Sequence, residues 1–382
     1  MKIAYISPSE LPSRSANSIH VLMQCDALAQ ISKDLVLYAQ RSSIKSTQLR
    51  DDVREVYGVN LKNIRLFTFY SRYKRGNNLI IALFAVYDLL NSKWPDIVIS
   101  RNLYASFIIS VILRKPIMFE THQLELGIRK WIQYFVIKQK KTTTIVISNI
   151  LATLLEEHQN VKPTKVIVLH DAAPSGCIPI SKLNRYQSLI NHVPQAKGDW
   201  LGVCGYFGHL YSGRGIEVIE KIAILRPKVL FLIFGGNDSE LQQRRASNEC
   251  SNIFYQGYVP YHEAQKIMRS VDILLMPYQK NVSIGIPGHD TARWMSPMKM
   301  FEYLASGVPI ISSDLPVLRE VLSNEINSLL VGPDNILEWA LAIDKLLEDK
   351  DFAAKISSSG FRDYQNNHTW LMRAQKIITS GM

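Results

Sequence analysis

The sequence predicts an α/β protein made of two doubly wound domains, each built on a parallel sheet. Short apolar segments alternate with segments of helical periodicity along nearly the whole chain, which is typical of βαβ units. This alternation is interrupted at residues 172–199, where polar and turn-forming residues dominate, and we expect a linker there. A chain of 382 residues also exceeds one typical hydrophobic core and fits two domains of ordinary size.

The composition indicates a globular protein, with 47% hydrophobic and 20% charged residues. Its four cysteines show no metal-like spacing, so we expect a reduced, cytoplasmic setting and no metal site. The opening segment MKIAYISPSE enters a strand at once and lacks the features of a signal peptide. No segment approaches the roughly 18 apolar residues that span a bilayer. We therefore expect a cytoplasmic location.

The positive charge is concentrated in the first half of the chain. Residues 1–145 contain 21 lysines and arginines against 10 acidic residues, whereas residues 146–382 contain 23 of each. Such a basic half suits nucleic acid, an anionic membrane surface or a polyanionic substrate. The sequence has no zinc-finger spacing and no aromatic signature of an RNA-recognition motif, which disfavours nucleic acid.

The first half begins with a strand, a loop and a helix, the order of a ligand-binding βα unit. The strand covers residues 2–6, the loop covers residues 7–18, and the helix starts near Ile19. The loop lacks the GxGxxG pattern, so dinucleotide binding is not predicted there. Further strands are expected at residues 35–39, 64–69, 96–100, 116–120, 144–148 and 165–169.

Two of these strands end in polar residues, Ser100-Arg101 and Glu120-Thr121-His122. Functional groups of parallel sheets lie beyond the carboxyl ends of the strands, so we expect these residues to line a binding site. His122 is a candidate for a contact with substrate by hydrogen bonding rather than metal binding. The alternative is a histidine with a structural role only.

Two segments of the first half combine basic with apolar side chains, residues 71–90 and 129–141. One interpretation is an ordinary loop and a core helix. The other is a surface that docks on an anionic membrane, because basic side chains beside exposed apolar ones bind acidic headgroups.

The second half starts with a strand at residues 200–204 and a glycine-rich loop at residues 205–215. Glycines permit a close approach of the backbone, and Arg214 offers a bidentate grip on phosphate. A long polar loop at residues 278–294 follows the strand at residues 271–277, and loops of that length are usually functional.

The most informative stretch, SPMKMFEYLASGVPIISSD, predicts a turn, a helix, a glycine stop and a strand. Ser296 stands at the expected N-cap and Pro297 in the first turn, where no amide donor is required. The free amides and the helix dipole favour an anion, which would explain Lys299 in the first turn. Glu302, one turn after Met298, is placed to contact sugar hydroxyls. Phosphate plus ribose indicates a nucleotide.

The run SPMKMFEYLASGVPIISSDLP resembles the donor-binding segment of retaining GT-B glycosyltransferases of the GT4 family. In that family the second glutamate of a Glu-x7-Glu pattern binds the nucleotide ribose, and Glu302 stands at its position. Trp294 stands where the first glutamate belongs, which departs from the pattern. Asp290 or His289 would replace that glutamate, or would only order the loop.

The resemblance implies further site residues in both halves of the chain. His122 corresponds to a histidine that lies against the donor sugar. In the glycine-rich loop, Arg214 stands at a lysine position and His209 at an arginine position, so Arg214 is the stronger candidate for the donor diphosphate. The implied catalytic residues are His122, Arg214 and Lys299, the implied nucleotide-binding residues are Gly208, His209, Tyr258, Asp290, Ser296, Pro297, Met298 and Glu302, and the implied acceptor residues are Asn17, Ser18 and His20.

The resemblance also implies the GT-B architecture, in which two Rossmann-like domains face each other across a cleft. We predict an acceptor-binding domain at residues 1–185 and a nucleotide-sugar-binding domain at residues 196–360. A final helix at residues 361–382 is expected to cross back to the first domain.

The implied activity is retaining transfer of a sugar from a nucleotide-sugar donor to a saccharide acceptor. We expect no cofactor and no metal, because Arg214, Lys299 and helix amides would stabilise the leaving diphosphate. The basic first half suits a lipid-linked acceptor at the inner face of the cytoplasmic membrane, in the assembly of a bacterial surface polysaccharide of the O-antigen or capsule type. The alternatives are a nucleotide-sugar 2-epimerase of the same fold and a non-catalytic nucleotide-sugar-binding partner of a glycosyltransferase complex.

Overall fold

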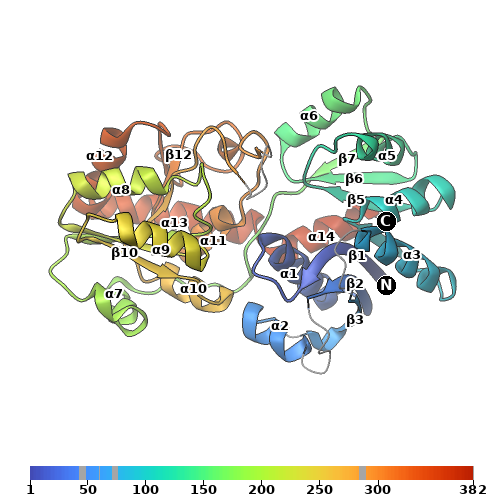
Figure 1. Ribbon diagram of the computed structural model, residues 1–382, viewed down its shortest axis with the longest axis horizontal. Helices are drawn as coiled ribbons and strands as arrows, with labels where there is room; N and C mark the ends of the chain where they lie inside the picture. Colours follow the sequence, from blue (N-terminus) through green and yellow to red (C-terminus); the bar gives the residue numbers. More distant parts are fainter. Residues whose placement is uncertain (43–48, 60, 71–75, 284–289, 382) are drawn as a thin grey trace. The chain divides into compact units, whose positions relative to one another are not determined.

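The computed structural model describes residues 1–42, 49–59, 61–70, 76–283 and 290–381, and it divides into two compact units (Figure 1). Unit 1 consists of Met1–Asp171 and Trp370–Met382, and unit 2 consists of Ala172–Thr369. Each unit is built on one parallel sheet with helices packed against it. The prediction of two doubly wound α/β domains is confirmed. Among the described helices, none has the length and apolar character required to cross a bilayer.

Unit 1 has a seven-stranded sheet in the order β3-β2-β1-β4-β5-β6-β7. Because the strand order reverses between β1 and β4, the topology places a binding crevice at the carboxyl ends of these strands. The strands are β1 (Lys2–Leu11), β2 (Asp34–Arg41), β3 (Ile64–Phe69), β4 (Ile97–Ser100), β5 (Ile117–Thr121), β6 (Thr142–Val146) and β7 (Lys165–Val168). The helices are α1 (Ala16–Ile31), α2 (Leu49–Tyr57), α3 (Asn77–Leu90), α4 (Leu103–Phe107), α5 (Ile128–Ile137), α6 (Asn149–Gln159) and α14 (Trp370–Gly381).

The first strand is longer than predicted and buries both of its faces. Ala4 and Ile6 belong to the core cluster that includes residues of α3, whereas the Tyr5 hydroxyl reaches Glu120. Pairing with β2 resumes after a register shift between Ile6 and Glu10, which extends β1 through part of the predicted loop.

Unit 2 has a six-stranded sheet in the order β10-β9-β8-β11-β12-β13. Every residue of β9 is buried, as expected for a parallel strand covered on both faces. The strands are β8 (Gly202–Phe207), β9 (Val229–Phe234), β10 (Ile253–Gly257), β11 (Ile273–Met276), β12 (Ile310–Ser313) and β13 (Leu329–Val331). The helices are α7 (Lys182–His192), α8 (Ile216–Leu225), α9 (Asp238–Ser247), α10 (Tyr261–Met268), α11 (Met298–Ser306), α12 (Ile336–Glu348) and α13 (Lys350–Asn367).

The unit boundaries differ from the predicted residues 185 and 361. The stretch expected to be a linker contains α7, which packs against α10 of unit 2 and whose Leu189 is buried. Its many polar residues obscured this amphipathic helix. The C-terminal tail is two helices rather than one: α13 stays in unit 2, and α14 packs against α1 in unit 1.

Candidate active site

Unit 2 gathers the predicted nucleotide-binding residues at the carboxyl ends of its strands. Gly208 follows β8, Tyr258 follows β10, and α11 begins at Met298. The helix start differs in detail from the prediction, because Pro297 occupies the N-cap position and Ser296 precedes it. Pro297 has extended backbone angles and offers no side-chain cap, so the first amides of α11 are not capped by the N-cap side chain.

The amine of Lys299 lies in an environment that is unusual for a charged group. Its Nζ atom is buried and has no hydrogen-bond partner among the residues that the structure describes. It lies 4.1 Å from the centroid of the Tyr206 ring and 5.0 Å from that of the Tyr278 ring. Burial holds the pKa of the lysine well below its usual value, and the nearby Arg214 lowers it further while Glu302 opposes both effects.

Gly208 makes room for this lysine. Its φ of +151° lies outside the range that other residues commonly adopt. A Cβ atom at this position would lie 2.7 Å from Lys299 Nζ, closer than such atoms approach one another. The glycine-rich loop and α11 therefore meet at the lysine amine.

Arg214 brings a second cation to the same place. Its Nη1 donates to the Tyr278 hydroxyl at 3.0 Å, and its Nε is buried without a partner in the described parts of the chain. The next residue, Gly215, has a φ of +84°, and a Cβ atom there would lie 1.9 Å from the Pro277 carbonyl oxygen. Only glycine at this position therefore allows the loop to pack against the segment that follows β11.

His209, the residue at the expected arginine position, lies beside Lys299 and Arg214, but its ring contributes little positive charge. Its ring stacks on Tyr211 with centroids 4.7 Å apart. Burial lowers the pKa of His209, and the charges of Arg214 and Lys299 lower it further. The ranking of Arg214 above His209 as a source of positive charge agrees with this geometry.

Lys299 Nζ and Arg214 Nε are both buried without a partner among the described residues, which is energetically unfavourable by itself. A buried charged donor that lacks an acceptor costs on the order of 1–3 kcal/mol or more. A polyanionic ligand would offset that cost, since its oxygens would accept from both side chains and from the amides that begin α11. The arrangement has the chemistry of a diphosphate site.

Glu302 lies one turn along α11 from this cationic pair. Its side chain is buried and stands beside the Tyr261 hydroxyl, whose pKa is raised by burial and then by this carboxylate. A carboxylate at that position accepts hydrogen bonds from hydroxyl groups, which is the chemistry expected for a ribose contact.

Asp290 orders its loop, which is one of the two roles predicted for it. Its Oδ1 accepts the backbone N–H of Val282 at 2.8 Å and that of Ala292 at 2.9 Å. His289, the other candidate for replacing the missing glutamate, lies outside the described residues. Tyr258 is partly exposed at the end of β10, in a position open to a ligand.

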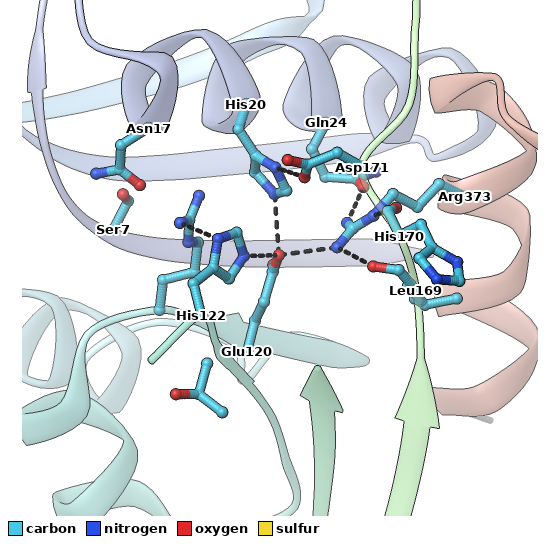
Figure 2. A network of polar contacts seen from close by, with 12 residues as sticks. Ser7, Asn17, His20, Gln24, Glu120, His122, Leu169, His170, Asp171 and Arg373 are labelled. Carbon is cyan, nitrogen blue, oxygen red and sulfur yellow. Dashed lines mark hydrogen bonds and ion pairs between the residues drawn. The ribbon is translucent and has the colours of Figure 1, made fainter. Parts of the chain in front are cut away.

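Unit 1 contains a second polar centre, around Glu120 near the end of β5 (Figure 2). Three side chains from different elements converge on its Oε1 atom, each at 2.9 Å: His20 of α1, His122 just after β5 and Arg373 of α14. The Tyr5 hydroxyl donates to Oε2, also at 2.9 Å. The carboxyl is fully buried, yet its positively charged neighbours, Arg373 foremost, outweigh desolvation and hold its pKa well below the usual value.

His122 is the one predicted catalytic residue of unit 1, and the structure places it at this centre. It is partly exposed, and Arg101 Nη2 lies 3.0 Å from its Nδ1 atom while Glu120 lies at its Nε2 atom. Burial lowers the pKa of His122 to about 4, with Arg101 acting in the same direction and Glu120 in the opposite one. The imidazole is therefore neutral at physiological pH.

Two of the three predicted acceptor residues have internal roles instead. His20 is 2% exposed and lies between Glu120 and Asp171, 2.6 Å from Asp171 Oδ1. Ser18 is buried, and its hydroxyl donates to the Glu10 carbonyl at 2.8 Å. Their burial and internal hydrogen bonds do not favour direct contacts with an acceptor for either residue. Asn17 is exposed and donates to Ser9 Oγ at 2.7 Å.

His20, Glu120 and His122 have side chains of the metal-ligating type, with ligand atoms within 4.8 Å of one another. Arg373 and Arg101 share the cluster, however, and their positive charges oppose the binding of a divalent cation there. The geometry favours a hydrogen-bonded charge network.

Arg101 was expected at a binding site because it follows a strand, but sequence reasoning missed two members of this centre, Asp171 and Arg373. Asp171 lies just beyond β7, so strand-end polarity was a usable signal for it as well. Arg373 lies 253 residues from its partner Glu120 and sits within a helix, where nothing in the local pattern marks it.

Comparison with known proteins shows similarity to glycosyltransferases. Residues 202–349 match the model of the family Glycosyl transferases group 1. The phosphatidyl-myo-inositol mannosyltransferase of Mycolicibacterium smegmatis is 26% identical over 139 residues, covering 36% of this chain and 33% of the relative. The putative teichuronic acid biosynthesis glycosyltransferase TuaH of Bacillus subtilis is 24% identical over 149 residues, covering 38% of this chain and 34% of the relative.

The sequence similarity to these curated relatives spans less than half of their length. The structural similarity extends further. HepE of Anabaena, solved in complex with UDP, superposes with a TM-score of 0.74 at 14% identity, covering 100% of this chain and 99% of that one. Residues 202–349, within the second unit, thus match the glycosyl transferases group 1 family, and the chain shares the GT-B fold along its full length.

Proposed function

We propose that the protein is a retaining glycosyltransferase that moves a sugar from a nucleotide-sugar donor to a saccharide acceptor. The observation that carries the proposal is the pair of cationic side chains, Lys299 and Arg214, whose Nζ and Nε atoms are buried without a described partner. Gly208 leaves room for the Lys299 amine. Glu302 supplies the ribose contact on the same helix as Lys299. The HepE structures with UDP and with UDP-glucose support a nucleotide-sugar donor for this fold.

In the proposed reaction the bond between the anomeric carbon and the diphosphate oxygen breaks, and the electron pair leaves with the diphosphate. Lys299, Arg214 and the amides that begin α11 stabilise the negative charge that grows on it, which lowers the barrier. The acceptor hydroxyl forms the new bond to the anomeric carbon, and its proton passes to a diphosphate oxygen. Retention of configuration rests on the resemblance to the GT4 family.

The proposal is tested by release of nucleoside diphosphate from a panel of nucleotide sugars, with EDTA present and absent. We expect slow hydrolysis of one donor that EDTA leaves unchanged, because the two cations take the place of a metal. Chelation that stops turnover would contradict the metal-free part of the proposal. Conversion of the donor to its 2-epimer would identify the epimerase, and binding without any product would identify a non-catalytic partner.

We further propose that unit 1 docks on an anionic membrane, where a lipid-linked acceptor would be presented. Helices α3 and α5 both pack against α4, and both expose large apolar side chains. Tyr87 of α3 is 68% exposed and Trp131 of α5 is 63% exposed. Other exposed apolar residues on the two helices are Leu79, Ile80, Leu83, Phe84, Leu90, Ile128 and Phe135.

The charges around this apolar surface favour acidic headgroups. Lysines at positions 130, 138, 140 and 141 lie on or directly after α5. The acidic residues nearby are paired internally, since Glu125 binds Arg129 at 2.6 Å and Asp88 accepts from the Tyr38 hydroxyl. Apolar insertion plus a basic rim is the composition of a peripheral membrane surface.

The double substitution Trp131→Ser/Phe135→Ser should weaken binding to vesicles of phosphatidylcholine and phosphatidylglycerol by about tenfold or more, since two exposed aromatic side chains that would insert into the bilayer are lost. Sedimentation with such vesicles measures this. The matched control, Leu337→Ser/Leu341→Ser, removes two comparably exposed residues from α12 of unit 2 and should bind like the wild type. Equal loss in both variants, or equal binding to pure phosphatidylcholine, would contradict the proposed surface.

A further inference from the structure

The neighbours of His122 determine which of its ring nitrogens accepts a hydrogen bond and which one donates. Arg101 Nη2 faces the Nδ1 atom, and a guanidinium can only donate, so Nδ1 must be the acceptor. The proton of the neutral ring then resides on Nε2, which donates to Glu120 Oε1 at 2.9 Å. The chain of bonds runs from Arg101 through His122 to Glu120.

This direction requires Glu120 to remain a carboxylate inside the protein. Arg373 supplies the compensating charge at the same oxygen (Figure 2). Its guanidinium is itself fixed, because Nε donates to the His170 carbonyl at 3.0 Å and Nη1 donates to Gln24. The arginine therefore has little freedom to leave the carboxylate.

We infer that Glu120 and Arg373 are positioning residues that hold His122 in its Nε2–H tautomer, so that the ring can meet a substrate only as a hydrogen-bond acceptor at Nδ1. The chemical group at that position is then a donor, such as a sugar hydroxyl, which would take the place of Arg101 at Nδ1. The role of the His122 ring toward substrate rests on the proposed glycosyl transfer. The assignment of the tautomer does not depend on that proposal.

The first test is nitrogen-15 NMR of the histidine rings in the full chain, with His122 assigned through His122→Gln. At neutral pH we expect a neutral ring protonated at Nε2. A ring protonated at Nδ1, or a mixture of tautomers, would overturn the inference. This readout needs no donor, so it distinguishes failure of the inference from failure of the proposed function.

The second test compares the titration of His122 in variants of its two supports. The charged and titratable groups that face it are Arg101 after β4, Glu120 of β5, His20 of α1, Asp171 after β7 and Arg373 of α14. Arg373→Met removes positive charge and should raise the pKa of His122. Glu120→Gln removes negative charge and should not raise it. A rise of the His122 pKa in both variants would indicate only that solvent has entered the site. That result would overturn the positioning role of Glu120 and Arg373.

Activity provides the third readout. Arg373→Met should lower kcat on the order of 10-fold to 100-fold through misplacement of the ring, with KM less affected. Arg373→Lys keeps the charge and should restore most of kcat. Lys376→Met, which removes an exposed positive charge from the same helix, serves as the control and should leave both the tautomer and kcat close to wild type. An Arg373→Lys variant as impaired as Arg373→Met would contradict the role of its charge.

Discussion

Replacing Lys299 with methionine should lower kcat/KM by about 100-fold to 1,000-fold and at the same time make the ligand-free protein more stable. The loss follows from removal of one positive group that faces the growing charge of the leaving diphosphate. The gain follows because the amine is buried without a partner among the described residues and its pKa is depressed. A depressed lysine pKa means that folding disfavours the charged form at neutral pH, so deleting the charge removes a penalty.

The expected gain in the free energy of unfolding is about 1–2 kcal/mol, which corresponds to a rise of roughly 2–8 °C in Tm for a domain of this size. Thermal unfolding and initial rates measured on the same preparation check both effects. Lys228→Met, at an exposed position of unit 2, is the matched control and should change neither quantity. A Lys299→Met variant with lower Tm and unchanged turnover would show that the lysine is structural.

Replacing Gly215 with alanine should abolish nucleotide binding and cost about 3 kcal/mol or more of unfolding free energy. The added Cβ atom would lie 1.9 Å from the Pro277 carbonyl oxygen, so the loop that carries Arg214 must move. The positive φ of +84° adds conformational strain. Chemical denaturation measures the stability, and calorimetric titration with nucleoside diphosphate measures the binding.

Gly76→Ala separates strain from steric overlap, because Gly76 has a φ of +85° and its added Cβ atom would meet no atom of the described residues within 4 Å. We expect it to cost about 1 kcal/mol and to leave nucleotide binding intact. If Gly215→Ala were no more destabilising than Gly76→Ala, the close packing of the glycine-rich loop against Pro277 would be contradicted.

The sequence alone was sufficient to predict the fold and to name Lys299 and Arg214 as the candidate cations of unit 2. Alternating apolar strands and periodic helices follow from local physics, and the positions of Lys299, Arg214 and Glu302 follow from their places at strand and helix ends. The Pro297 start of α11 was predicted within one residue, although Pro297 rather than Ser296 takes the N-cap position.

Contacts between distant parts of the chain could not be predicted in this way. His20 was predicted to contact the acceptor because of the family resemblance, but α1 turns it toward Glu120 and Asp171. Arg373 completes that centre from the last helix, and no local pattern encodes such a pairing. The helix at residues 182–192 was missed because its many polar residues made the stretch resemble a linker.

The central claim, that unit 2 binds the diphosphate of a nucleotide sugar through its buried cations, is tested most directly by thermal unfolding with UDP-, GDP-, dTDP- and ADP-sugars in EDTA. A ligand at about 100 times its Kd stabilises the folded state by roughly 2.7 kcal/mol, so even a slow enzyme reveals its donor. The account predicts a clear rise in Tm with one nucleotide class in the wild type and none in Lys299→Met. No rise with any of the four in the well-folded wild type, or an equal rise in Lys299→Met, would contradict it.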